Sequence, residues 1–231
     1  MSKALISLVV IMAKTIIGIN LKAYAEALGK RALEIAEVCE KVKEERQDVE
    51  FFLCVQAVDI RDVAKRGVDV FAEHVDAVEP GAKTGHITVE AVKDAGAKGV
   101  MLNHSEKRIR IDEIEYVLNR AKEKGLKTLV CAATPLQAKA LACLNPDYVA
   151  VEPPELIGGN VSVSKAKPEV VKDTVSLVRE VNKNCLILVG AGIKNSEDVK
   201  RSVELGANGV LLASAVAKAK DVEKAIKNLL P

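Results

Sequence analysis

The stretch GVMLNHSE at residues 99–106 indicates most clearly how this chain folds. Its four apolar residues are typical of a strand buried in a parallel sheet, and polar side chains follow at once. The same form recurs in IIGINLK at residues 16–22 and in YVAVEPP at residues 148–154. Each predicted strand therefore ends in a group that can do chemistry: an imidazole, an ammonium or a carboxylate.

Such strands alternate with amphipathic helical segments along the chain. The clearest helix is predicted at Ala27–Glu45, where Leu28, Ala32 and Ile35 form an apolar stripe. The predicted strands are Thr15–Asn20, Glu50–Val55, Asp69–His74, Lys98–Asn103, Lys127–Cys131, Asp147–Glu152, Cys185–Val189 and Gly209–Leu212. Eight strand-helix units in about 215 residues predict an α/β fold, a single (β/α)8 barrel built on eight parallel strands.

The barrel domain is predicted to span residues 15–231, and residues 1–14 are predicted to be an N-terminal extension that leads into the first strand. Ala4–Ala13 is apolar and could imitate a weak signal peptide, but a second methionine, Met12, precedes the first strand directly. We therefore expect a dispensable extension and a cytoplasmic protein.

Composition narrows the possible partners. The 231 residues are 49% hydrophobic, and 34 Lys and Arg against 32 Asp and Glu give a net charge of only +2. This balance does not favour nucleic-acid binding. No apolar stretch approaches the roughly 18 residues that a membrane span needs, so we expect no membrane partner.

Neither the cysteines nor the histidines form a recognisable reactive or metal-binding pattern. The five cysteines are scattered and odd in number, as expected of reduced structural residues. Cys131 ends a predicted strand and could be a nucleophile, but no histidine lies beside it in the sequence. His74, His86 and His104 lack the spacing of metal ligands, so no metal site is predicted.

Lys22, His104 and Glu152 follow the first, fourth and sixth predicted strands. In a parallel barrel the carboxyl ends of the strands share one rim, so these side chains should be neighbours there. A cation, an electrophile and a base together suggest proton transfer next to a carbonyl. Singly, each has a structural alternative: a solvated lysine, a histidine capping a turn, or a glutamate capping a loop.

The last two units predict a phosphate site. Small residues follow both strands, Gly190-Ala191-Gly192 after the seventh and Ala213-Ser214 after the eighth. They would let backbone N–H groups approach an anion, although ordinary tight turns use the same residues. The segment EPPELIGGN at residues 152–160 has prolines at its start and glycines at its end. This pattern favours a lid that moves between hinges over a fixed surface loop.

At these residues the chain closely resembles the triosephosphate isomerase family. The matching motifs are NLK at residues 20–22, NHSEKR at 103–108, VEP with IG at 151–153 and 157–158, and GAKTG at 81–85. The short length is similar to the compact archaeal branch. The resemblance implies a TIM barrel that interconverts dihydroxyacetone phosphate and glyceraldehyde 3-phosphate through an enediolate, in glycolysis and gluconeogenesis, without a metal or organic cofactor.

The resemblance also implies residue roles. Glu152 would be the base, His104 would polarise the carbonyl as a neutral imidazole, and Lys22 would stabilise negative charge on oxygen. Glu106 would support the site, and the substrate-binding residues would be Asn20, Leu21, Lys22, Ile157, Gly158, Gly192, Ala213 and Ser214.

The GAKTG loop, with Thr84 and Gly85, looks like the segment that in this family enters a pocket of a neighbouring subunit. This likeness implies self-association, with a homotetramer favoured over a homodimer. A solvated turn is the structural alternative.

The chain departs from the family pattern at three places. Pro154-Glu155-Leu156 stands where most members have an apolar lid segment with Trp, Gly190-Ala191-Gly192 replaces a Gly-Gly-Ser run, and Ala213-Ser214 replaces two glycines. These changes concern the phosphate contacts and the lid, not the proton chemistry.

Two rival functions stay open from the residues alone. One is another phosphate-binding barrel enzyme, such as an epimerase, an aldolase or a synthase, but no convincing Schiff-base lysine or paired metal ligands are found at the predicted strands. The other is a catalytically silent barrel that only binds a phosphorylated metabolite, which would not need Lys22, His104 and Glu152 together.

Overall fold

Eight parallel strands pair in chain order and close into a barrel, because β1 pairs with both β2 and β8. The computed structural model describes residues 14–159 and 161–231. Its strands are β1 (Thr15–Asn20), β2 (Val49–Val55), β3 (Asp69–Ala72), β4 (Gly99–Leu102), β5 (Lys127–Ala132), β6 (Tyr148–Val151), β7 (Leu186–Gly190) and β8 (Gly209–Leu212). The predicted (β/α)8 barrel is confirmed.

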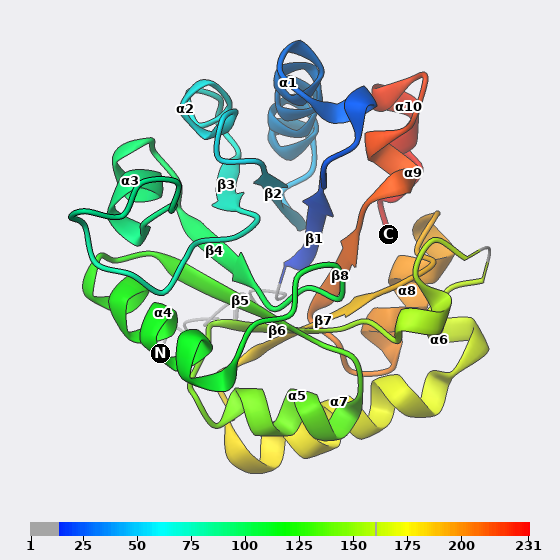
Figure 1. Cartoon of the computed structure of the whole chain (residues 1–231). Helices are drawn as coiled ribbons and strands as arrows, with labels where there is room; N and C mark the ends of the chain where they lie inside the picture. Colours follow the sequence, from blue (N-terminus) through cyan, green and yellow to red (C-terminus); the bar gives the residue numbers. More distant parts are fainter. Residues whose placement is uncertain (1–13, 160) are drawn as a thin grey trace, which may run out of the picture.

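Helices follow the strands and form an outer ring around them (Figure 1). They are α1 (Lys30–Glu45), α2 (Ile60–Val63), α3 (Val89–Asp94), α4 (Ile111–Glu123), α5 (Pro135–Ala142), α6 (Val163–Ala166), α7 (Pro168–Val181), α8 (Ser196–Glu204), α9 (Ser214–Ala217) and α10 (Val222–Lys227), with 3₁₀ turns η1 (Ala25–Ala27) and η2 (Pro154–Leu156). Side chains cap several N-termini; Thr134, for example, accepts from the Gln137 N–H at the start of α5.

The strands are buried on both faces, which explains their continuous apolar runs. Inside the barrel a compact cluster includes Phe52 and Phe71, whose ring centroids stack 4.6 Å apart. A larger cluster fills the space between the barrel and the helices, with Ile17, Leu53 and Val130 among its fully buried members. The two cores fix the strand ends in space, and with them the side chains that follow.

Five of the predicted strands differ from the structure by one residue at one or both ends, and two element boundaries differ by more. The first helix begins at Lys30 and not at Ala27, because the chain makes the turn η1 and then passes through Gly29 with φ +55°. The Gly29 N–H donates to the Asp59 carboxylate at 3.2 Å, outside the helix. The third strand ends at Ala72, two residues before His74, where the chain leaves the sheet and His74 contacts Asp76.

The predicted N-terminal extension falls on residues 1–13, outside the described residues, and on Lys14, which precedes β1. Among residues 14–159 and 161–231, no helix combines the length and apolar character required to cross a bilayer.

Candidate active site

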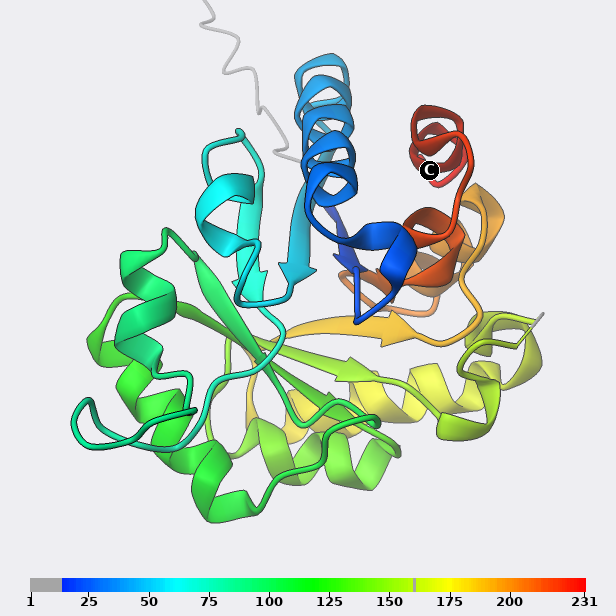
Figure 2. The same ribbon diagram turned by 45° about the horizontal axis from the view of Figure 1, so that its top comes forward.

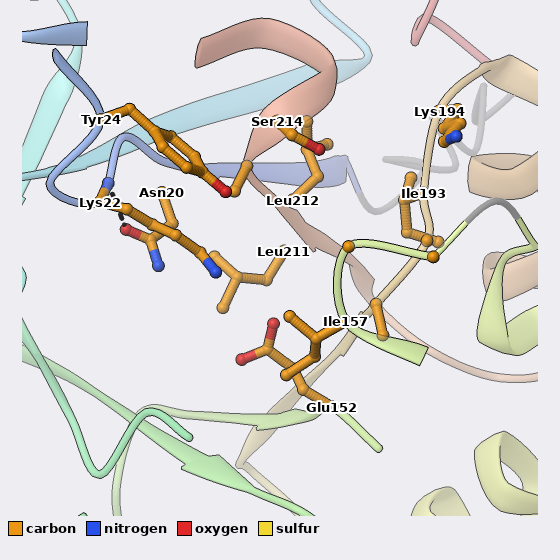
Figure 3. A pocket seen from close by; sticks show the side chains of 15 residues that line it. Asn20, Lys22, Tyr24, Glu152, Ile157, Ile193, Lys194, Leu211, Leu212 and Ser214 are labelled. Atoms are coloured by element: carbon orange, nitrogen blue, oxygen red, sulfur yellow. Dashed lines mark hydrogen bonds between the residues drawn. The ribbon is translucent and has the colours of Figure 1, made fainter. Parts of the chain in front are cut away.

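Lys22, His104 and Glu152 meet at the carboxyl-terminal rim of the barrel, just beyond β1, β4 and β6. Figure 3 shows the side chains of Lys22 and Glu152 pointing into the same pocket from opposite sides. The closed barrel brings the three residues together although 130 positions separate the first from the last along the chain.

The backbone at the end of β1 aims Lys22 into the site. Lys22 has φ +52°, an uncommon conformation for a side-chain-bearing residue, and its N–H donates to Asn20 Oδ1 at 3.0 Å. Its Nζ lies 2.7 Å from Glu106 Oε1, and the Lys22 side chain is only 9% exposed. Glu106 therefore holds the ammonium group in the site while remaining largely exposed itself.

The segment after β4 fixes the imidazole of His104. Asn103 has φ +58°, and its side-chain amide donates to the Cys131 carbonyl at 2.9 Å. The Glu106 N–H donates to His104 Nδ1 at 3.2 Å, so Nδ1 is an acceptor and the proton of the neutral ring is on Nε2. Burial, followed by the charge of Lys22, lowers the pKa of His104 to about 4.

The residues after His104, Ser105–Lys107, form a hydrogen-bonded turn and not the first turn of a helix. The Lys107 N–H donates to the His104 carbonyl at 2.9 Å, and α4 begins only at Ile111. The pKa of the imidazole is therefore lowered by burial and by Lys22, with no adjoining α-helix.

Glu152 is a buried carboxylic acid next to the imidazole. Its N–H donates to the Ala132 carbonyl at 2.8 Å, which continues the sheet register by one residue. Burial raises the pKa of its carboxyl to about 7, although a hydrogen bond with Cys131 and the charge of Lys22 act in the opposite direction. Gly190 leaves room for this side chain: a Cβ there would lie 2.4 Å from Glu152 Cγ.

Two polar atoms face each other across the site without a hydrogen bond. His104 Nε2 and Glu152 Oε2 are 3.5 Å apart, and neither has a hydrogen-bond partner among the described residues. Buried polar atoms are normally paired, so an unpaired donor opposite an unpaired acceptor indicates a place for a polar ligand.

Beyond the three central residues, the pocket extends to the ends of β7 and β8. Of the predicted substrate-binding residues, Asn20, Ile157, Gly158, Gly192, Ala213 and Ser214 line it. Gly192 has φ +73°, and a Cβ there would come within 2.2 Å of the Val161 carbonyl oxygen, so the loop after β7 requires glycine at this position.

Leu21 lies elsewhere. Its side chain is buried in the core between barrel and helices, and it is not among the residues that line the pocket. The alternation of side chains at the strand end explains the difference, since Asn20 and Lys22 face the pocket and Leu21 points the other way.

Sequence reasoning did not identify Tyr24, which also lines this pocket, or the role of Gly190 in making room for Glu152. Tyr24 gives no local signal in the sequence, because only the closed barrel brings the end of β1 beside the end of β8.

The GAKTG loop lies between β3 and α3 and extends away from the barrel in both overall views (Figure 2). Thr84 and Gly85 are exposed. A second groove with a volume of about 430 Å³ adjoins this pocket; Asn20 and Lys22 line both, and His104 and Glu106 line the groove.

Within the described part of the chain, no group of three or more His, Cys, Asp or Glu side chains is arranged to hold a metal ion.

The fold and the site together define a (β/α)8-barrel protein with an acid-base centre at the carboxyl ends of its strands. The family model described as "Triosephosphate isomerase" matches residues 15–229, so the chain belongs to the triosephosphate isomerase family.

Archaeal proteins named triosephosphate isomerase are similar to the chain over nearly its whole length. The protein of Methanocaldococcus jannaschii is 51% identical, over 93% of this chain and 98% of that protein. The protein of Methanothermus fervidus is 46% identical, over 95% and 99% of the two chains. The protein of Archaeoglobus fulgidus is 47% identical, over 92% and 95%.

Proposed function

We propose that this protein is a triosephosphate isomerase, which interconverts dihydroxyacetone phosphate and D-glyceraldehyde 3-phosphate in glycolysis and gluconeogenesis. The observation that carries the proposal is that His104 Nε2 and Glu152 Oε2 face each other beside the Lys22 ammonium group, each without a hydrogen bond to any residue that the structure describes. Family membership over residues 15–229 supports the same reaction.

Glu152 is the general base in this proposal. Its carboxylate removes a proton from C1 of dihydroxyacetone phosphate, which gives an enediolate with its charge on O2. The hydroxyl proton then passes from O1 to O2, and Glu152 returns its own proton to C2, so that C1 becomes the carbonyl carbon. A base is most effective when its pKa lies near the working pH, and burial raises the pKa of Glu152 to about 7. The same burial keeps the proton from exchanging freely with water.

His104 and Lys22 stabilise the negative charge that develops on the substrate oxygen. The Nε2–H of His104 is free to donate to this oxygen because Nδ1 already accepts from the Glu106 N–H. Lys22 supplies a fixed positive charge that Glu106 orients. Such preorganised donors in a buried site commonly supply the largest part of the stabilisation of a transition state.

The phosphate group would lie toward the ends of β7 and β8, where Gly192, Ala213 and Ser214 leave space beside the backbone. Ile157 and Gly158 line the same pocket from the segment after β6. Their position supports a lid role for residues 153–160, of which Asn160 lies outside the described residues.

Self-association, as a homotetramer in preference to a homodimer, completes the proposal. The groove beside the active site contains Val58, which is 82% exposed, and Glu73, whose Oε1 is buried without a hydrogen-bond partner among the described residues. An apolar residue and an unpaired acceptor in one groove are suited to the Thr84 loop of a second copy.

A coupled assay with glyceraldehyde 3-phosphate, run on the wild type and on Glu152→Gln, tests the function. We expect isomerase activity in the wild type and a loss of at least about a thousandfold in kcat in the variant. Glu115→Gln, the same change at an exposed position of α4, serves as the control and should keep full activity.

Thermal unfolding at pH 8 separates loss of chemistry from loss of fold. Because the pKa of Glu152 is raised in the folded protein, its ionisation costs stability as the pH rises from about 4.5 to about 7. Glu152→Gln should therefore melt at or above the wild-type temperature. An inactive wild type, or a variant within tenfold of wild-type activity, would contradict the proposed mechanism.

A further inference from the structure

Tyr24 lines the substrate pocket, and no part of the proposed mechanism uses its hydroxyl group. It lies just before η1, on the segment that leaves β1, and it lines the pocket together with Ala213 and Ser214. In Figure 3 its side chain extends from the segment after β1, with the hydroxyl toward Leu212 and Ser214.

The ring of Tyr24 is held from two sides. One face packs against the hydrophobic core, and Lys218 Nζ lies 4.3 Å from the ring centroid. A cation over an aromatic face is attracted by the negative potential of the ring, which restrains the ring further. The hydroxyl is therefore presented to the pocket at a fixed position.

The hydroxyl itself has no hydrogen bond to any described residue, whereas the ring has the contacts just given. A phenylalanine ring at this position would pack against the core and contact Lys218 equally well. What the hydroxyl adds is one O–H donor at the end of the pocket where the small residues lie.

A phosphate dianion is the ligand that such a donor suits. Its three terminal oxygens accept several hydrogen bonds, and O–H donors form short, strong bonds to charged oxygens. Ala213 and Ser214 place side chains where a pair of glycines would leave more of the backbone open, which increases the value of a side-chain donor at this end.

We propose that the Tyr24 hydroxyl donates a hydrogen bond to a phosphate oxygen of the substrate and so is a substrate-binding residue of the isomerase. This inference rests on the proposed function. The contact is made equally in the ground state and in the transition state, so it should lower KM and leave kcat almost unchanged.

Tyr24→Phe removes the donor and keeps the ring under Lys218. We expect KM for glyceraldehyde 3-phosphate and the inhibition constant of inorganic phosphate to rise at least about tenfold, because hydrogen bonds to charged groups are the stronger ones. The rate constant kcat should stay within twofold. Tyr116→Phe is the matched control, because Tyr116 is on α4 and does not line the pocket. This variant should leave KM, kcat and the phosphate inhibition constant unchanged.

The phosphate-free triose D-glyceraldehyde shows which part of the substrate the hydroxyl contacts. Its kcat/KM should be the same for the wild type and for Tyr24→Phe. Equal losses for the phosphorylated and the phosphate-free substrate would overturn the assignment, and so would a phosphate inhibition constant within twofold of the wild type.

Calorimetric titration with inorganic phosphate tests the contact without any assay of turnover. Weaker phosphate binding by Tyr24→Phe would support the inference even if the wild type proved not to be an isomerase, so the two proposals fail separately. Thermal unfolding of Tyr24→Phe should match the wild type, and a melting temperature lowered by more than a few degrees would indicate a structural role instead.

Discussion

At the scale of single residues, the site is built from side chains whose ionisation is shifted in opposite directions. Burial raises the pKa of the Glu152 carboxyl and lowers that of the His104 imidazole, because both groups are more stable uncharged away from water. The result is a carboxyl group that can exchange a proton near neutral pH and an imidazole that stays neutral.

The ionisation of His104 can be tested directly by ¹⁵N NMR. With its pKa lowered to about 4, His104 should remain the neutral Nε2–H tautomer from pH 5 to pH 9. Its signal is assigned by its loss in His104→Gln. Titration with a midpoint near 6.5, or a proton on Nδ1, would contradict the geometry described here.

The residues of the site differ in how far the sequence revealed them. Lys22, His104 and Glu152 were predicted because each follows an apolar run at a strand end. Leu21 was assigned to substrate binding and lies in the core. Tyr24 was not predicted, since its place beside α9 depends on the closure of the barrel between β1 and β8.

At the scale of elements, positions of strands were predictable and the conformations of connections were not. Buried parallel strands have a strong local signature, and all eight were predicted to within two residues. The turn η1 and the late start of α1 depend on Gly29 and on its contact with Asp59, 30 positions away. A contact between distant segments does not change the pattern of apolar and polar residues within either segment, so it cannot be predicted from that pattern.

The segment after β6 is the element whose role is most open to test. It contains η2, and its exposed Glu155 pairs with Lys167 next to α7. Ile157 and Gly158 contribute to the pocket wall.

Deleting Leu156–Gly158 should leave a folded protein that releases inorganic phosphate from triose phosphate. An enediolate next to a phosphate ester expels phosphate when water reaches it, and the lid would exclude that water. Phosphate release is measured colorimetrically beside circular dichroism, with Glu155→Gln as a control that changes the segment but not the pocket. Unchanged product partition would argue against a lid.

At the scale of the whole molecule, the barrel presents two features that a single copy leaves unused. The loop that carries Thr84 extends from the body of the barrel, and a groove of about 430 Å³ adjoins the active site. Since the groove shares Lys22 with the active site, association of copies would bear directly on catalysis.

Size-exclusion chromatography with light scattering measures this association. We expect the wild type at micromolar concentration to be a tetramer, and Thr84→Arg to form smaller species with at least about tenfold lower activity, because the much longer arginine side chain would not fit a groove that receives threonine. Ser176→Arg, on the exposed face of α7, is the matched control. A monomeric wild type would refute the self-association.

The sequence by itself determined the barrel, the order of its strands and the positions of Lys22, His104 and Glu152 just after them. These features could be predicted because a buried strand and the polar residue that follows it are both recognisable within a few consecutive residues. Tertiary structure alone decided the rest: the protonated nitrogen of His104, the shifted pKa of Glu152 and the place of Tyr24. These depend on which distant groups share a small volume from which water is excluded, and only closure of the barrel brings those groups together.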